Sequence, residues 1–368
     1  MKIAAVNIFK YDTAIKGKPY RMSNTVMTHF DTTIVEIITD TGLRGYGETC
    51  PVGPVYQPQH ALGARAALEQ MGPTLIGENP LQPRNIYQAM DNALNGHAYA
   101  KAAVDIAVWD ICGKAYGARV CDLLGGAVRE DVPSYYSIGV CPVEEAVESA
   151  REKQAEGYPR IQVKLGGRSL EEDIEVLQKV AGVIKPGVRL AADANRGWTL
   201  RDAIFASSAC RDIPLILEQP CNTYDENRQL AGRVCHPVYL DENTESLNMV
   251  LRAVAQGVAD GFGFKVTRLG GITQMQTVRD VCRETGRPMT CDDAWGGDII
   301  AAACVHLGAT VPAHLCEGVW LAAPYTTTHY DRDNGIAIVN GHIKLPEGPG
   351  LGITPDTALF GPPVLEFG

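Results

Sequence analysis

The pattern of hydrophobic and polar positions changes character along the chain. In the first 50 residues apolar and polar positions alternate. Residues 32–39 are β-branched and end at a turn signal, so they predict a strand, and residues 43–48 read as its returning partner. Residues 15–24 and 50–58 contain glycine and proline and predict loops. From about residue 57 to residue 116 the pattern becomes helical. The chain therefore begins with an α+β module.

A second pattern begins near residue 132, where short apolar segments alternate with longer helical segments. Near-continuous apolar strands that alternate with helices indicate parallel βα units, and eight such units predict a (β/α)₈ barrel. The fold class that we expect is α/β, a modified TIM barrel with an N-terminal α+β capping domain. The eight predicted strands are residues 134–140, 160–165, 189–194, 214–219, 237–242, 261–266, 288–293 and 311–317.

These two patterns and the segment that follows them divide the chain into three regions. We expect residues 1–125 to form the capping domain, whose loops at 15–24 and 50–58 contribute to specificity, and residues 126–323 to form the catalytic barrel. Residues 324–368 contain two short strand candidates and a Gly/Pro-rich run. We expect this C-terminal segment to leave the barrel and pack back on the capping domain.

Composition narrows the class of protein. The 368 residues are 45% hydrophobic and 21% charged with a net charge of −10, which argues against a nucleic-acid or anionic-membrane binder. The 11 cysteines include no CxxC pair, and no apolar run is long enough to span a membrane. We therefore expect reduced thiols in a cytoplasmic protein. The partners that we expect are a small-molecule substrate and further copies of the chain in a homo-oligomer.

Polar side chains mark the carboxyl ends of the predicted strands. Because they recur at near-constant intervals, each falls at the same height in successive βα units. The catalytic groups of such barrels gather at this face. The predicted ring consists of Ser137, Lys164, Asp193, Glu218, Asp241, Lys265, Asp292 and Glu317.

Three neighbouring strands contribute carboxylates to this ring, namely Asp193, Glu218 and Asp241. Three anions at one place repel one another strongly unless a cation compensates them. An all-oxygen set without His or Cys favours Mg²⁺ over Zn²⁺ and leaves coordination positions for water and an oxygen-bearing substrate. The alternative is that one or two of these carboxylates pair with Arg or Lys.

Two lysines flank the carboxylates, Lys164 one strand before them and Lys265 one strand after them. In a closed barrel they face each other across the mouth, with the metal between them. A lysine acts as a base near neutral pH only when its pKa is lowered, and burial and a nearby divalent cation both lower it. Such a pair suits proton abstraction from one face of a substrate and delivery to the other. The alternative is that each lysine only pairs with the carboxylates.

The motifs around these residues are Gln162-Val163-Lys164, Asp193-Ala194-Asn195, Glu218-Gln219-Pro220, Asp241-Glu242 and Lys265. Together they resemble the muconate-lactonizing-enzyme subgroup of the enolase superfamily, and the resemblance covers the whole chain. It implies removal of a proton α to a carboxylate and a metal-stabilised enediolate. In this implied site Mg²⁺ is bound by the three carboxylates, and Lys164 and Lys265 are the acid/base pair. Asn195 and Glu242, which belong to these motifs, are further candidate site residues.

One position departs from that subgroup. Its members usually have Lys-x-Lys on the second barrel strand, whereas the first position here is Gln162. If the usual lysine helps to lower the pKa of its neighbour, Lys164 depends more on the metal. The departure bears on the working pH and not on the class of reaction.

The substrate class depends on the capping loops and the last two barrel strands. We expect Tyr56, Trp295 and Trp320 to form an aromatic wall, with Asp292 or Asp293 adding negative charge beside it. Aromatic faces and a carboxylate suit a cationic nitrogen, above all a quaternary one that donates no hydrogen bond. The alternative for the tryptophans is a place in the core.

Four local strings, residues 47–54, 162–166, 291–298 and 317–320, resemble the epimerases of this subgroup that act on 4-hydroxyproline betaine. The resemblance implies inversion of Cα of proline betaines, with Tyr56 and Trp320 on the quaternary ammonium and Asp292 on the same side. The first alternative is a cis-3-hydroxyproline dehydratase, which forms the same enediolate but loses the β-hydroxyl. A dipeptide epimerase, a cycloisomerase and a betaine-binding protein without activity are further alternatives. The two intact lysines argue against the last.

Overall fold

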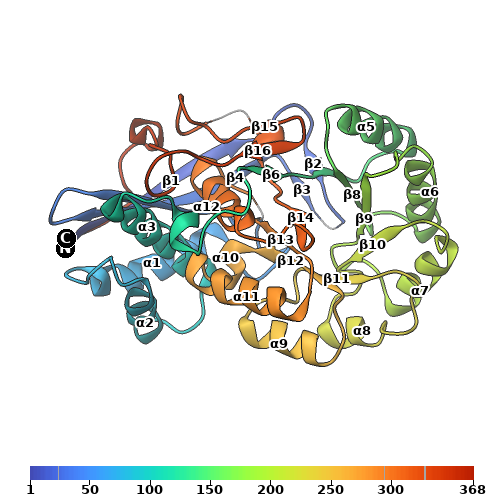
Figure 1. The fold of residues 1–368 in the computed structure, drawn as a ribbon, viewed down its shortest axis with the longest axis horizontal. Coiled ribbons are helices and arrows are strands. Elements are labelled where there is room, and N and C mark those ends of the chain that lie inside the picture. The colour runs from blue at the N-terminus through green and yellow to red at the C-terminus, as the bar shows by residue number, and fades with distance from the viewer. Residues whose placement is uncertain (24, 294, 327–328) are drawn as a thin grey trace.

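The computed structural model describes residues 1–23, 25–293, 295–326 and 329–368 of the chain. Its N-terminal module is an antiparallel sheet in the order β17-β1-β4-β5, with helices packed against it (Figure 1). The strands are β1 (Ile3–Ala14), β4 (His29–Thr39), β5 (Arg44–Thr49) and β17 (Leu365–Phe367), and the helices are α1 (Ala61–Leu75), α2 (Pro83–Ala93) and α3 (Ala98–Tyr116). The predicted α+β module is confirmed.

The packing of this module follows from side-chain size and alternation. Val6 and Ile8 of β1 and Val35 of β4 join the buried faces of the three helices in one apolar core. On β5, Gly47 lies so close to α3 that an added Cβ would stand 1.7 Å from the carbonyl oxygen of Ala103. Only glycine allows the helix to approach the sheet at this point.

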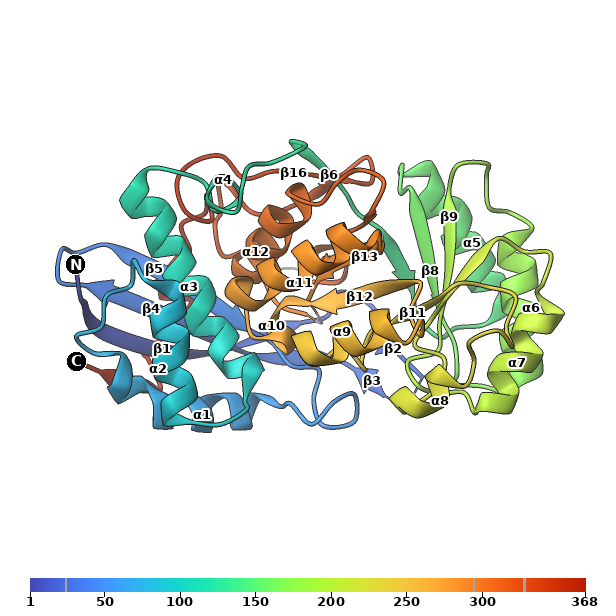
Figure 2. The same cartoon turned by 60° about the horizontal axis from the view of Figure 1, so that its bottom comes forward.

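The second module is an eight-stranded parallel sheet in the order β7-β8-β9-β10-β11-β12-β13-β14. A parallel bridge between Ser134 and Val319 joins the two ends of the sheet, so it closes into a barrel with helices outside (Figure 2). The strands are β7 (Tyr136–Ile138), β8 (Arg160–Lys164), β9 (Arg189–Asp193), β10 (Leu215–Glu218), β11 (Val238–Leu240), β12 (Gly261–Lys265), β13 (Met289–Asp292) and β14 (Cys316–Gly318). The helices are α4 (Val120–Leu123), α5 (Val143–Ala155), α6 (Leu170–Ala181), α7 (Leu200–Ala209), α8 (Tyr224–Arg228), α9 (Leu247–Ala255), α10 (Val266–Leu269), α11 (Ile272–Thr285) and α12 (Asp298–Ala309).

Alternation along β8 shows how the barrel places polar groups inside. Ile161 and Val163 join the apolar cluster with α5 and α6, on the helix side of the strand. Arg160, Gln162 and Lys164 point to the opposite face, into the barrel. The strand is buried on both faces, as parallel strands usually are.

All eight predicted strands overlap the observed ones, but the last prediction, residues 311–317, shares only its final two residues with β14 and is wrong in where the strand begins. β14 begins at Cys316, and the chain from Val311 to Leu315 is the connection that leaves α12. Glu317 therefore lies near the start of its strand, where it pairs with Arg189 at the start of β9 at 3.0 Å. The prediction that Glu317 belongs to the ring at the barrel mouth is therefore wrong, because this carboxylate lies at the opposite end of the barrel, beside the first residues of β8 and β9.

The C-terminal segment leaves the barrel and returns to the first module, as predicted. β15 (Ile338–Val339) and β16 (His342–Lys344) form a small sheet with β6 (Asp131–Pro133). β17 then adds to the edge of β1, which brings the two termini close together (Figure 1).

The first capping loop contains a short hairpin of β2 (Tyr20–Arg21) and β3 (Val26–Met27); Asn24 of the predicted loop lies outside the described residues. The Tyr20 hydroxyl donates to Ser137 Oγ at 3.2 Å, so this loop lies over the barrel mouth. No helix in the described part of the chain is long and apolar enough to cross a membrane.

Candidate active site

The three carboxylates predicted as metal ligands lie side by side at the carboxyl ends of β9, β10 and β11. Asp193 and Glu218 are the last residues of their strands and are partners in register. Asp241 follows directly on β11. All three are buried, so the structure brings together the acidic set that the sequence predicts.

Each of these carboxylates has a cationic partner. The pairs are Lys164 with Asp193, Arg160 with Glu218 and Arg268 with Asp241. The alternative of pairing with Arg or Lys is thus realised for all three. Burial raises the pKa of Glu218 to about 7, with the charge of Asp193 adding to the effect. Burial also raises the pKa of Asp241, but Arg268 and Lys265 outweigh it and lower the pKa to about 2.

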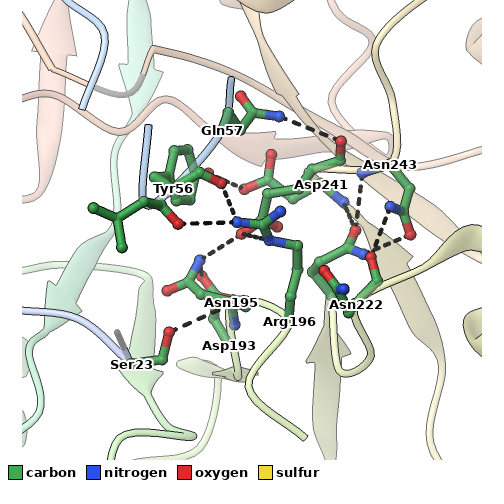
Figure 3. A network of polar contacts seen from close by, with 12 residues as sticks. Ser23, Tyr56, Gln57, Asp193, Asn195, Arg196, Asn222, Asp241 and Asn243 are labelled. Carbon is green, nitrogen blue, oxygen red and sulfur yellow. Dashed lines mark hydrogen bonds and ion pairs between the residues drawn. The ribbon is translucent and has the colours of Figure 1, made fainter. Parts of the chain in front are cut away.

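Asn195 and Glu242 extend this acidic centre (Figure 3). The side-chain amide of Asn195 donates to Asp193 Oδ2 at 3.1 Å and to Glu242 Oε1 at 3.2 Å. Burial and the neighbouring charge of Asp241 raise the pKa of Glu242 to about 8. Two polar atoms, Glu242 Oε2 and Asn195 Oδ1, are buried without a hydrogen-bond partner among the described residues.

This donor set fits a hard divalent cation. It consists of carboxylate and amide oxygens, and it includes two oxygens without a partner among the described residues. Burial, with the charges of neighbouring carboxylates adding to it, raises the pKa values of Glu218 and Glu242. As they stand, no three His, Cys, Asp or Glu side chains of the described chain are grouped closely enough to hold an ion. Lys164 and Lys265 instead pair with Asp193 and Asp241, so binding of an ion requires these two lysine pairs to open.

The two lysines approach from opposite walls of the barrel. Lys164 ends β8 and Lys265 ends β12, with β9, β10 and β11 between them. Lys265 Nζ lies 3.4 Å from both Asp241 Oδ2 and Asp292 Oδ2. Burial by itself acts to lower the pKa of each lysine, but the net pKa values are not lowered as predicted. The neighbouring carboxylates, first Asp193 for Lys164 and Asp241 for Lys265, outweigh burial and hold both pKa values above the ordinary range.

Gln162 takes part in a chain of hydrogen bonds below Lys164. Ser137 Oγ donates to Gln162 Oε1 at 2.7 Å, and Gln162 Nε2 donates to Glu218 Oε2 at 2.9 Å. Arg160 donates to the same Glu218 oxygen at 3.0 Å. The neutral amide therefore holds Glu218 without adding a positive charge beside Lys164.

A small cavity of about 40 Å³ lies between the two lysines. The capping loops close it from above, and the barrel strand ends form its floor. Its lining consists of Tyr20, Met22, Val52, Tyr56, Tyr135, Ser137, Gln162, Lys164, Lys265, Asp293, Trp295 and Trp320. The lining thus includes the predicted residues Tyr56, Asp293, Trp295 and Trp320.

Trp295 and Trp320 form one wall of the cavity with the capping domain behind them. Their ring centroids are 5.1 Å apart in an edge-on arrangement, and Trp295 stacks on Phe30 of β4 at 3.9 Å. Trp320 stacks on Tyr325 at 5.4 Å. Both tryptophans are buried, so they belong to an apolar cluster and line the cavity at the same time.

Asp292 and Asp293 fix the segments around this wall. Asp292 accepts hydrogen bonds from the Tyr135 hydroxyl at 2.7 Å and from the backbone N–H of Trp320 at 2.6 Å. Asp293 accepts from the backbone N–H of Thr267 at 2.9 Å. Both carboxylates therefore place negative charge beside the aromatic wall, and Asp292 anchors the backbone of Trp320 while Asp293 anchors the backbone of Thr267 in α10.

The second capping loop is held down on the acidic centre (Figure 3). The Tyr56 hydroxyl donates to Asp241 Oδ2 at 3.2 Å, and Gln57 Nε2 donates to the Glu242 carbonyl at 3.3 Å. The Arg196 guanidinium donates to the Tyr56 carbonyl. These contacts bring Tyr56 to the site, as the sequence predicts.

Three arginines of this region were not among the predicted site residues, although the sequence pattern indicates two of them. Arg160 stands four positions before Lys164, so strand alternation places both on the inner face. Arg268 follows Lys265 by one helical turn at the start of α10. Arg196 has a left-handed backbone with φ 69°, and its side chain contacts the Tyr56 carbonyl. The sequence pattern predicts neither feature.

Comparisons with known proteins identify the family of the chain. Two family models match, the mandelate racemase / muconate lactonizing enzyme N-terminal domain over residues 3–125 and the enolase C-terminal domain-like model over residues 145–359. A cis-3-hydroxy-L-proline dehydratase of Roseibium aggregatum is 39% identical over 368 residues, which is 100% of both chains.

Two solved structures from Roseovarius nubinhibens have the same fold. One is a mandelate racemase/muconate lactonizing enzyme with 34% identity and a TM-score of 0.94, covering 100% of this chain and 98% of the other. The second is a member of the enolase superfamily complexed with magnesium, with 32% identity and a TM-score of 0.94, covering 100% and 99%.

Proposed function

Because the chain belongs to the mandelate racemase/muconate lactonizing enzyme group of the enolase superfamily, we propose that it is an epimerase that inverts C2 of proline betaine or 4-hydroxyproline betaine. The observation that carries the proposal is the position of Lys164 and Lys265 on opposite walls of one small cavity, beside a cluster of three carboxylates. An epimerase needs a proton acceptor on one face of a carbon and a proton donor on the other.

In the proposed mechanism the two lysines begin a turnover in different protonation states. This requires that the pairs with Asp193 and Asp241, which raise the lysine pKa values, are broken when the site is loaded. The neutral amine of one lysine takes the proton from Cα, and the ammonium of the other delivers a proton to the opposite face of the same carbon. The configuration at Cα is inverted and the lysines exchange their protonation states. The same site then serves the reverse reaction.

Asp193, Glu218 and Asp241 are the residues proposed to hold Mg²⁺. When bound, the ion supplies positive charge that stabilises the negative charge developing on the substrate carboxylate. The chain supports this role through Arg160 and Gln162, which donate to one oxygen of Glu218, and through Arg268, which holds Asp241.

The aromatic wall supports a substrate with a cationic nitrogen. Trp295, Trp320 and Tyr56 present rings to the cavity, and Asp292 and Asp293 add negative charge nearby. A quaternary ammonium donates no hydrogen bond, so it is recognised by aromatic faces and by charge. A small substrate is also favoured, because residues of both capping loops line the cavity, whose volume is about 40 Å³.

Proton NMR in D₂O tests the proposal. The purified protein with Mg²⁺ is incubated with L-proline betaine and, separately, with its 4-hydroxy form. The expected result is loss of the Cα proton signal together with appearance of the opposite C2 epimer. Absence of both changes on both betaines would refute the epimerase.

A second candidate is cis-3-hydroxy-L-proline dehydratase, which the 39% identical relative favours. In this reaction one lysine removes the same α-proton, and the β-hydroxyl leaves with the electrons of its C–O bond and takes a proton from the other lysine to form water. The enamine that remains tautomerises to the ketimine, a pyrroline. The same NMR experiment with cis-3-hydroxy-L-proline distinguishes the two. Formation of the pyrroline product without exchange on betaines would assign the dehydratase.

A further inference from the structure

Gln219 stands at the point where the β10–β11 ladder ends. The last pair in register is Glu218 with Tyr239, and the Gln219 N–H still donates to the Tyr239 carbonyl at 2.9 Å. Asp241 lies beyond this ladder, where no main-chain carbonyl of β10 reaches its N–H. Another group has to hold the backbone of this carboxylate.

The side chain of Gln219 supplies that group. Its Oε1 accepts from the backbone N–H of Asp241 at 3.0 Å and of Asn243 at 3.2 Å. Its Nε2 donates to the Cys221 carbonyl at 3.0 Å and to Asn243 Oδ1 at 2.6 Å. The residue is completely buried, so these bonds have no competition from water. Figure 3 shows Asn243 beside Asp241 at this junction.

The backbone of Gln219 reaches the strand on the other side. Its carbonyl accepts from the N–H of Arg196 at 2.9 Å, directly after the end of β9. Gln219 has φ 36°, and Asn195 and Arg196 have φ 42° and 69°. Left-handed backbone at non-glycine residues is unfavourable and persists where surrounding contacts enforce it, commonly beside functional sites. Gln219 directly follows Glu218, and Asn195 and Arg196 lie two and three residues after Asp193.

We propose that Gln219 is a positioning residue that sets the spacing of Asp193, Glu218 and Asp241 for a divalent cation. It acts through the backbone of Asp241 on one side and of Arg196 on the other, and it touches neither substrate nor ion. This inference rests on the proposed function, because it assumes that the three carboxylates bind Mg²⁺. Contacts that hold a ligand in place commonly change metal affinity 10–100-fold when they are removed.

The test measures Mg²⁺ affinity without substrate, by isothermal titration calorimetry of the whole chain with MgCl₂. Q219L removes all four side-chain bonds and keeps the size of the residue close to native. The matched control is Q154L on α5, because Gln154 is also buried and bonds to Ala150, Val183 and Lys185 far from the site. Circular dichroism and thermal unfolding in EDTA report the folding of each variant.

The expected result is a Mg²⁺ dissociation constant that is 10–100-fold higher for Q219L than for wild type and unchanged for Q154L. Both variants are expected to unfold at a lower temperature than wild type. A Q219L constant within twofold of wild type would overturn the positioning role. If wild type itself binds no Mg²⁺, the proposed metal site fails and the positioning role fails with it. If wild type and Q219L bind Mg²⁺ with equal affinity, the positioning role of Gln219 is wrong but the proposed metal site stands.

A conservative variant keeps the test decisive if Q219L does not fold. In Q219E the carboxyl group still accepts from Asp241 and Asn243, and in its protonated form it still donates one bond. The Mg²⁺ dissociation constant of Q219E is expected to lie within threefold of the wild-type value. Tenfold weaker binding by a folded Q219E would contradict the assignment of positioning to the two accepted bonds.

Discussion

His306 offers a titration test of the packing between α12 and its neighbours. Its ring is fully buried. Nδ1 accepts from the backbone N–H of Cys121 at 3.4 Å, which leaves the proton on Nε2 for donation to the Leu351 carbonyl at 3.2 Å. The neutral ring satisfies both partners, whereas a protonated ring would lose the first bond and place a charge in the core.

Burial lowers the pKa of His306 from 6.5 to about 4. Between these values the unfolded chain binds more protons than the native protein, so the free energy of unfolding falls as the pH drops below 6.5. The full contribution is present above pH 6.5, and the loss is complete below pH 4. At pH 5 the loss amounts to about 2 kcal/mol of the roughly 3.4 kcal/mol available from the shift.

Urea unfolding followed by circular dichroism at pH 8 and pH 5 measures this effect. H306Q is the reference, because its amide offers one acceptor and one donor and does not titrate. Between the two pH values wild type is expected to lose about 2 kcal/mol more than H306Q. An equal pH dependence of the two proteins would show that His306 is protonated in the native state or exposed to water.

Three further changes probe the site itself. R160M removes the buried Arg160–Glu218 ion pair and leaves Glu218 with Gln162 and Glu317 with Arg189. Urea unfolding should therefore show a free energy of unfolding about 3 kcal/mol lower than that of wild type, and a decrease below about 1 kcal/mol would contradict a buried ion pair. W320L should raise KM for a betaine about 10–30-fold with a smaller change in kcat, while W320F retains most of the affinity; equal kinetics for both would exclude a cation–π contact. E218Q should abolish turnover in a folded protein, as should excess chelator with wild type, and full activity in chelator would refute the metal site.

Much of the site was predictable because of one regularity. Strands buried on both faces produce continuous apolar runs, and their carboxyl ends fall at one face of a parallel barrel. Lys164, Asp193, Glu218, Asp241 and Lys265 could therefore be placed together from their spacing, and the structure places them around one centre. Their roles in binding and catalysis stay predictions.

The misplaced strand shows where this regularity ends. α12 is buried on all sides, and apolar residues recur past its end at Val311 and Leu315, so hydrophobicity alone does not mark where β14 begins. Glu317 was assigned to the mouth for that reason, whereas β14 starts later and the carboxylate faces Arg160 and Arg189.

The contacts between modules were not predictable from local pattern. Arg196 reaches the Tyr56 carbonyl, and Trp295 stacks on Phe30, across separations in sequence that no period links. The raised pKa of Lys164 likewise depends on the geometry of its pair with Asp193, which outweighs the burial that the sequence suggested.

The most direct test of the central claim is proton exchange by the two lysine variants in D₂O. K164A and K265A, each with Mg²⁺, are incubated with either C2 epimer of the betaine and followed by proton NMR. The account predicts that neither variant epimerises, and that each retains Cα exchange only with the epimer whose proton faces its remaining lysine. Exchange at wild-type rates by both variants would contradict the two-base mechanism.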